Sequence, residues 1–310
     1  MLEVRSLSIH FHRYTRGLRR TVLTPVVDLY LKVSAGEVVA VVGSSGSGKS
    51  LLAHTVLGLL PSNAKVEGEI WFKGELLTPE RQALARGRQI ALIPQSVSFL
   101  DPLMRVGAQV RRAAQLSGKN RHSAAAQRAI FQRYQLPLEV ERWYPFQLSG
   151  GMARRTLVSM AVVGEAELIL ADEPTPGLHP EVVRETLNHL RQLADEGRGV
   201  VLITHDIQAA LQVADQIAVF YAGTTVEIAP VTAFSGKGEG LLHPYTQALW
   251  RSLPQNEFIP LPGMQPPPQD LPQGCLFAPR CPLATAECTA ERPTMRAIAQ
   301  NQVRCIHAQG

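Results

Sequence analysis

Hydrophobic and polar residues alternate near the start of the chain. The alternating segments cover residues 2–9 and 29–33, and between them lies a basic stretch with Arg13, Arg16, Arg19 and Arg20. A period of two is typical of strands that bury one face. The pattern therefore predicts an antiparallel β region that opens the chain.

Continuous apolar runs replace this alternation farther along. Residues 38–42 form the first run, and residues 168–171 and 200–203 form two more. Apolar residues at helical spacing follow the first run at 51–59 and separate the other two at 181–194. Short apolar runs that alternate with helices indicate buried, mostly parallel strands. The sequence therefore predicts an α/β fold.

The middle and the end of the chain break this rhythm. Helical patterns fill residues 96–147, which predicts a helical subdomain over about 96–160. Nine of the 22 prolines fall in residues 254–282, a density that excludes regular helix and central strand. We expect an α/β domain over residues 1–255, and a Pro-rich linker with a short C-terminal extension over residues 256–310.

Composition and charge narrow the class of protein. The 310 residues are 45% hydrophobic, which excludes disordered, collagenous and coiled-coil chains. The net charge of +5 is too small for a dedicated nucleic-acid-binding protein. No apolar run approaches the roughly 20 residues that cross a bilayer, and no secretory signal opens the chain. We therefore expect a globular protein of the cytoplasm.

One glycine-rich segment carries a complete phosphate-binding motif. Residues 43–50 match G-x-x-x-x-G-K-[ST] and lie between a predicted buried strand and a helix. The glycines allow backbone N–H groups to face phosphate oxygens, Lys49 reaches the β and γ phosphates, and the Ser50 hydroxyl binds Mg²⁺. The motif predicts a nucleoside triphosphate site. Its candidate residues are Gly43, Ser44, Ser45, Gly46, Ser47, Gly48, Lys49 and Ser50.

Two carboxylates end the second apolar run. Asp172 and Glu173 directly follow residues 168–171, at the carboxyl end of a predicted strand, where α/β sheets bind ligands. Asp172 is placed to hold Mg²⁺, and Glu173 to accept a proton from the attacking water as general base. We expect both acids to lie beside the phosphate-binding motif.

Residues 148–151, Leu-Ser-Gly-Gly, precede a predicted helix and form a second candidate anion site. Ser149, Gly150 and Gly151 offer a hydroxyl and exposed N–H groups at a helix N-terminus. This segment, followed by the Asp-Glu strand, resembles the signature of the ATP-binding cassette (ABC) ATPases. The resemblance implies a P-loop NTPase fold, ATP hydrolysis with Mg²⁺, and a dimer in which each P-loop faces the partner's Ser-Gly-Gly turn.

The same resemblance assigns roles to four further residues. It implies that Gln95 links the nucleotide and its Mg²⁺ to a transmembrane partner, and that His205 contacts the γ-phosphate. It also implies an aromatic residue that stacks on adenine, for which Phe11 is the first choice and Tyr14 the second. Either aromatic residue could instead pack in the β core.

The loop after the Asp-Glu pair departs from the family pattern. His179 stands where the family usually has an aspartate, in a loop that crosses the dimer interface. Because this residue would act on the partner's site, we expect a heterodimer with unequal sites. A neutral variant in a working homodimer is the alternative.

All four cysteines fall in the final 36 residues, as Cys275, Cys281, Cys288 and Cys305. A tail below about 40 residues needs a metal, a crosslink or docking to become ordered. Four thiolates suit a [4Fe-4S] cluster or Zn²⁺. The spacing lacks the paired C-x-x-C of zinc ribbons and favours the cluster, with Zn²⁺ or uncoordinated thiols as alternatives.

The segment around Cys275 and Cys281, with residues 243–246 upstream, resembles the C-terminal extension of the oligopeptide, dipeptide and nickel branch of ABC importers. This resemblance implies an ATPase subunit that energises import of peptides or nickel-type metal complexes from the cytoplasmic face of the inner membrane. The implied partners are a second ATPase subunit, two transmembrane permeases and, indirectly, a solute-binding protein, with no nucleic acid. The alternative is a soluble ABC ATPase that acts on nucleic acid or ribosomes.

Overall fold

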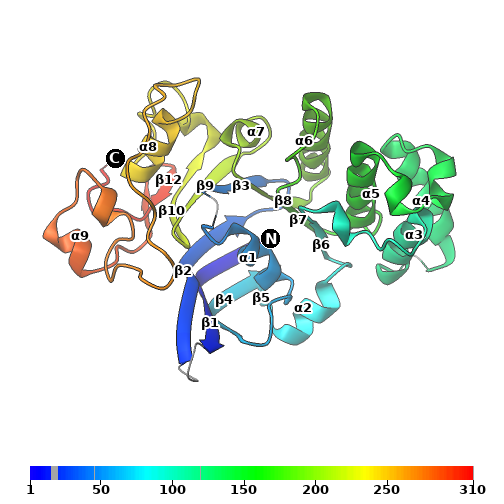
Figure 1. Cartoon of the computed structure of the whole chain (residues 1–310), viewed down its shortest axis with the longest axis horizontal. Coiled ribbons are helices and arrows are strands. Elements are labelled where there is room, and N and C mark those ends of the chain that lie inside the picture. The colour runs from blue at the N-terminus through cyan, green and yellow to red at the C-terminus, as the bar shows by residue number, and fades with distance from the viewer. Residues whose placement is uncertain (15–19, 45, 119, 310) are drawn as a thin grey trace.

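Two β-sheets form the framework of the chain (Figure 1). The computed structural model describes residues 1–309 apart from residues 15–19, 45 and 119. Within that part of the chain, one sheet has the strand order β2-β1-β4-β5 and the other has the order β11-β12-β10-β9-β3-β8-β7-β6. Helices from the middle of the chain lie beyond one end of the longer sheet, and the C-terminal residues lie at its other end.

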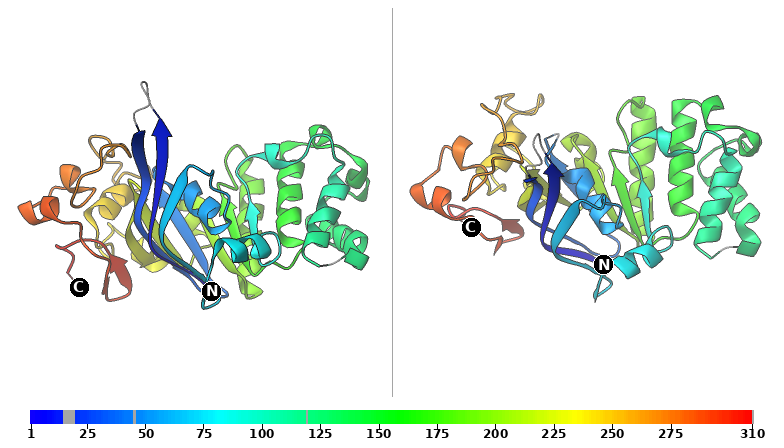
Figure 2. Two further views of the ribbon diagram at one scale, coloured as in Figure 1. Left: turned by 90° about the horizontal axis from the view of Figure 1, so that it is seen from below. Right: turned by 60° about the horizontal axis from the view of Figure 1, so that its bottom comes forward.

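The smaller sheet is the antiparallel region that the alternating residues predict. Its strands are β1 (Leu2–Tyr14), β2 (Arg20–Val33), β4 (Ala64–Phe72) and β5 (Glu75–Leu76), and all of them pair antiparallel. The alternating apolar side chains are buried in one core, whereas the far ends of β1 and β2 project from the body (Figure 2). The prediction is confirmed, although β1 and β2 are longer than the alternating segments.

The longer sheet has a parallel centre that is buried on both faces. Its strands β3 (Val38–Gly43), β6 (Ile90–Ile93), β7 (Leu168–Asp172), β8 (Gly199–Thr204) and β9 (Gln216–Tyr221) run parallel. Val38, Ala40 and Val42 belong to one core cluster, whereas Val39 and Val41 belong to the other. Burial on both faces explains the continuous apolar runs, and the predicted α/β fold is confirmed.

Helices cover this sheet and connect its strands. Helix α1 (Lys49–Val56) follows β3, α2 (Pro79–Ala85) precedes β6, α6 (Pro180–Asp195) joins β7 to β8, and α7 (Ile207–Leu211) joins β8 to β9. A separate helical group contains α3 (Val106–Leu116), α4 (Ser123–Arg133) and α5 (Gly150–Val162). No helix in the described ranges combines the length and the apolar character needed to cross a bilayer.

The C-terminal extension continues the longer sheet. Strand β10 (Thr224–Pro230) pairs antiparallel with β9, and β12 (Asn301–Val303) adds to β10, followed by β11 (Arg296–Ile298). Helices α8 (Pro244–Arg251) and α9 (Ala286–Ala290) lie on either side of the linker. Buried Arg304 donates hydrogen bonds to the backbone oxygens of Asp28, Thr225 and Pro293. The division at residue 255 stays a prediction, but the extension is joined to the core by strands and by this arginine.

Candidate active site

The glycine-rich loop joins β3 to α1 and packs closely against neighbouring strands. A Cβ atom on Gly43 would lie 2.4 Å from the carbonyl oxygen of Phe220, and one on Gly48 would lie 2.8 Å from Val26 Cγ2. Glycine is therefore required at both positions. Ser45 lies outside the described residues. The loop borders a cavity of about 350 Å³, lined by Pro25, Gly46, Gly48, Lys49, Ser50, Leu51, Gln95 and Glu173.

The Lys49 side chain is buried inside this loop. Its Nζ donates hydrogen bonds to the carbonyl oxygens of Gly43 and Ser44, at 2.7 Å and 3.0 Å. Burial lowers the pKa of Lys49, while the charges of Glu173 and Asp172 raise it. Charge-assisted hydrogen bonds to phosphate are stronger than bonds to neutral carbonyls, so a bound phosphate would attract the ammonium away from the loop.

Ser50 and Asp172 meet at the edge of the cavity. The Ser50 hydroxyl donates to Asp172 Oδ1 at 3.0 Å. Burial raises the pKa of Asp172, and the hydrogen bond from Ser50 lowers it. A hydroxyl and a carboxylate are oxygen ligands that Mg²⁺ accepts beside phosphate oxygens. The structure thus brings together two of the three predicted Mg²⁺ ligands, Ser50 of α1 and Asp172 of β7.

Glu173 and His205 form the second polar pair of the site. His205 Nδ1 lies 2.9 Å from Glu173 Oε2. Glu173 has a φ of 45°, a left-handed conformation that is uncommon for residues other than glycine, and its backbone N–H donates to the Ile203 oxygen. This backbone holds the buried carboxylate at the cavity wall. Strained residues of this kind cluster at functional sites.

Gln95 lines the same cavity, and its backbone is bound by a side chain of the helical group. Buried Arg154 on α5 donates to the carbonyl oxygens of Pro94 at 2.9 Å and Gln95 at 2.8 Å. The sequence does not predict this contact, because nothing near Arg154 in the chain indicates that it binds residues 94 and 95. It connects the helix that follows that turn to the predicted coupling residue.

The Ser-Gly-Gly turn is exposed. Among the described residues, it does not line the cavity beside Lys49 and Ser50, which we call the P-loop cavity. Ser149 is the N-cap of α5, and its hydroxyl accepts a hydrogen bond from the Met152 N–H at 3.3 Å. A Cβ on Gly150 would meet no atom within 4 Å, and Gly151 follows it in the first turn of the helix. A neighbouring molecule can therefore reach this turn.

The predicted adenine and interface residues lie at the margins. Phe11 pairs with Leu23 in β2 and packs, partly buried, against the core of the smaller sheet. Tyr14 is the final residue of β1, and its side chain lies outside the described residues. His179 is the exposed N-cap of α6 and makes no side-chain cap hydrogen bond. The adenine contact and the interface role stay predictions.

The four cysteines border one cavity of about 10 Å³, lined by His243, Pro244, Cys275, Phe277, Ala278, Cys281, Cys288, Pro293, Cys305, Ile306 and His307. The Cys288 sulfur lies 3.3 Å from His307 Nε2, a neighbour that the sequence pattern did not suggest. Across the described ranges, no three His, Cys, Asp or Glu side chains are arranged to hold a metal ion. The structure therefore gathers the thiols but does not support a [4Fe-4S] or Zn²⁺ site as it stands.

Comparisons with known proteins agree with this arrangement. Residues 26–176 match the family model described as "ABC transporter", and residues 226–288 match "Oligopeptide/dipeptide transporter, C-terminal region". The dipeptide transport ATP-binding protein DppD of Escherichia coli is 36% identical, over 99% of this chain and 96% of its own length. The chain belongs to the ABC transporter family. A putative peptide import ATP-binding protein of Brucella abortus is 33% identical, over 98% of this ABC protein and 94% of its own length.

Solved ABC structures have the same fold. A dimeric ATP-binding cassette bound to ADP and Pi superposes with a TM-score of 0.65 and 22% identity, and covers 74% of this chain and 99% of its own. The ATP-binding subunit of an ABC transporter superposes with a TM-score of 0.60 and 24% identity, over 76% and 91% of the two chains. The predicted fold and ATPase class are confirmed, and ATP with Mg²⁺ is the expected nucleotide. The comparisons do not support the alternative of an ATPase for nucleic acid or ribosomes.

We expect Ser50→Ala to raise the Mg²⁺ concentration required for half-maximal ATP hydrolysis by about tenfold, because one oxygen ligand worth roughly 1.4 kcal/mol is lost. The measurement is a Mg²⁺ titration at fixed ATP. Ser34→Ala, which removes an exposed hydroxyl that is not part of the cavity lining, is the control. An unchanged Mg²⁺ requirement in Ser50→Ala would contradict the assignment.

Proposed function

We propose that this protein energises the import of peptides through a membrane permease, from the cytoplasmic face of the inner membrane. The observation that carries the proposal is the match of residues 226–288 to the C-terminal region of oligopeptide and dipeptide transporters. Relatives named for dipeptide, oligopeptide and peptide import are 33–36% identical over nearly the whole chain. These names favour peptides over the nickel-type complexes that the sequence resemblance also allows.

The proposed assembly contains two different ATPase subunits and two permeases, with a solute-binding protein acting outside. The exposed turn at Ser149 supports a sandwich, because it is open to a second subunit and does not line its own P-loop cavity. The ATP-binding cassette with the same fold is dimeric. His179 at the exposed start of α6 supports unequal sites, because an imidazole replaces the usual carboxylate at the proposed interface.

In the proposed reaction, the Lys49 ammonium leaves the loop carbonyls and binds the β and γ phosphates. Ser50, Asp172 and Gln95 would hold Mg²⁺, which neutralises charge on the phosphate oxygens. Glu173 accepts the proton of the attacking water, and His205, whose Nδ1 lies 2.9 Å from the Glu173 carboxylate, contacts the γ-phosphate. Phe11, or Tyr14 as second choice, would stack on adenine.

Motion would pass to the permease through Gln95. The contact between Arg154 and the backbone of residues 94 and 95 makes this segment follow α5. When ATP closes two subunits around the Ser-Gly-Gly turns, α5 moves with its turn, and the segment after Gln95 moves with it. Hydrolysis and release then reopen the pair.

We further propose that the four cysteines hold a [4Fe-4S] cluster, with Zn²⁺ as the alternative. The support is that all four thiols border one cavity among apolar residues. A cavity of about 10 Å³ is too small for a four-iron cluster, so the cysteine segments would have to move to admit one. Bound metal would add to the strand pairing that already orders the extension.

The proposed assembly predicts that affinity purification of this chain from membranes recovers two hydrophobic permeases and a second, non-identical ATPase. In proteoliposomes, the complex should import a labelled dipeptide when ATP is present on the side of the ATPase subunits. Import of nickel but not of peptide would overturn the substrate class. Recovery of ribosomes or DNA without permeases would overturn the transport role itself.

Glu173→Gln should lower ATP hydrolysis by about 10²–10⁴-fold, because the amide cannot accept the proton of water. ATP binding should be retained, since Glu173 contacts water rather than the phosphates. ATPase assays and equilibrium nucleotide binding measure the two effects. Glu75→Gln, at an exposed edge strand, is the matched control. Substantial hydrolysis by Glu173→Gln would refute the assigned base.

Anaerobically purified protein should contain about four iron atoms per chain and absorb visible light, as an iron–sulfur cluster would. Cys281→Ser should lose both signals. Zinc in place of iron would support the alternative metal, and neither metal at stoichiometric amounts would contradict both. Elemental analysis and ultraviolet-visible spectra make these measurements.

A further inference from the structure

Ser44 of the P-loop shares a cavity with two residues from the C-terminal part of the chain, and one of them binds its side chain. Its hydroxyl donates to Gln265 Oε1 at 2.8 Å. Tyr245 on α8 lines the same cavity as Ser44; burial raises the pKa of this tyrosine, and the neighbouring Ser44 lowers it. The three residues border a cavity of about 360 Å³ that is separate from the P-loop cavity. The loop therefore has the nucleotide cavity on one side and the C-terminal region on the other.

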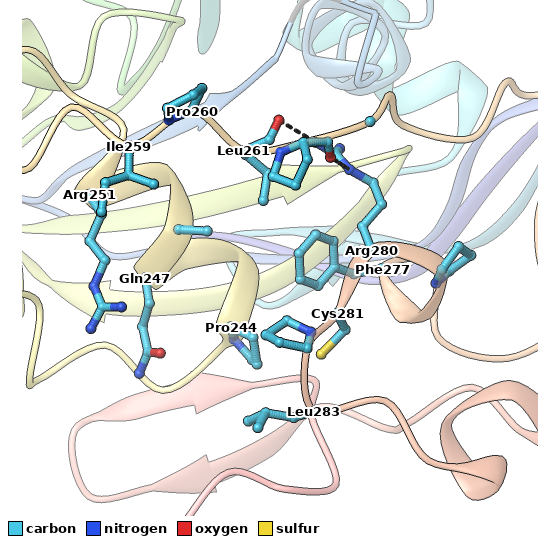
Figure 3. Close-up of a pocket in the computed structure, with 15 residues that line it drawn as sticks. Pro244, Gln247, Arg251, Ile259, Pro260, Leu261, Phe277, Arg280, Cys281 and Leu283 are labelled. Carbon is cyan, nitrogen blue, oxygen red and sulfur yellow. Dashed lines mark hydrogen bonds between the residues drawn. The ribbon is translucent and has the colours of Figure 1, made fainter.

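Gln265 is presented by a linker that is fixed on both sides of it. Upstream, Arg280 donates to the carbonyl oxygens of Pro262 at 2.8 Å and Leu261 at 3.3 Å (Figure 3). Downstream, the Pro268 oxygen accepts a hydrogen bond from the Thr24 N–H of β2 at 3.3 Å. Three consecutive prolines, 266–268, stiffen the segment between. The Gln265 side chain thus reaches Ser44 from a constrained backbone.

Tyr245 is fixed by aromatic packing. Its ring centre lies 4.5 Å from that of Tyr221 and 5.4 Å from that of Phe277. Phe277 belongs to the segment that carries Cys275 and Cys281 and borders the cysteine cavity. Aromatic packing therefore fixes Tyr245 in the cavity that it shares with Ser44, and this aromatic group continues to the cysteines.

We propose that Tyr245 and Gln265 are positioning residues of the nucleotide site and act through Ser44. The Ser44 carbonyl is one of the two that hold Lys49, so fixing the Ser44 side chain also fixes a backbone unit that sets the lysine position. A glycine-rich loop loses much conformational freedom when it binds phosphate. Contacts that hold the loop beforehand reduce this cost and strengthen binding. This inference goes beyond the proposed transport role, because it concerns ATP binding by the chain itself.

The test is a set of double-mutant cycles, measured as Mg·ATP affinity of the full-length chain. Gln265→Ala and Tyr245→Phe should each weaken binding by about two- to tenfold, the effect of one neutral hydrogen bond. In a Ser44→Ala background, the same changes should have a clearly smaller effect, because the Ser44 hydroxyl is gone. ATPase assays should show a higher KM for ATP with kcat changed less.

Two matched controls separate positioning from general destabilisation. Gln269→Ala removes an exposed glutamine of the same linker, and Tyr134→Phe removes a buried hydroxyl without a hydrogen-bond partner in the described residues. Both should bind ATP like the unaltered protein. Wild-type affinity in Gln265→Ala and Tyr245→Phe, or equal losses with and without the Ser44 hydroxyl, would overturn the proposal. Because no permease is present, this result is independent of any failure of peptide import.

Discussion

The buried ammonium of Lys49 is the interaction on which the site depends. It lies between two loop carbonyls, from Gly43 and Ser44, and its pKa reflects burial on one side and the charges of Glu173 and Asp172 on the other. The ammonium thus lies near two carboxylates and binds only neutral carbonyl oxygens, so it is available to an anionic ligand. A triphosphate with Mg²⁺ replaces these weaker partners with stronger ones, and the same groups can then respond to its hydrolysis.

The sheet places these groups together because its central strands are parallel. Strands β3, β8 and β7 are neighbours, so their carboxyl ends open at one edge. Lys49 follows β3, the acidic pair ends β7, and His205 follows β8. Burial of both sheet faces makes the edge rigid, and the helical group reaches it through Arg154. The strand order therefore brings together groups that are far apart in the sequence.

The sequence predicts the parts of this site whose signal is local. The P-loop, the acid pair and their strands are contiguous patterns, and the structure brings Ser50 and Asp172 within 3.0 Å. Contacts between distant residues leave no such pattern. Gln265 and Ser44 are separated by 221 positions, and the bond between them depends on how the linker crosses the fold. The strands of the extension were missed because three residues are too short for a period of two to be recognised.

The pairing of β12 with β10 has a consequence for the synthesis of the chain. Until residues 301–304 have emerged and docked, β10 ends the sheet with unpaired N–H and C=O groups, although every nucleotide motif has already been synthesised. Such an edge is a template for pairing with other chains. In the finished protein the exposed edge is β11, only three residues long, which offers little to pair with. A nascent or proteolytically trimmed polypeptide that lacks β12 would contain every nucleotide motif and yet be prone to aggregate.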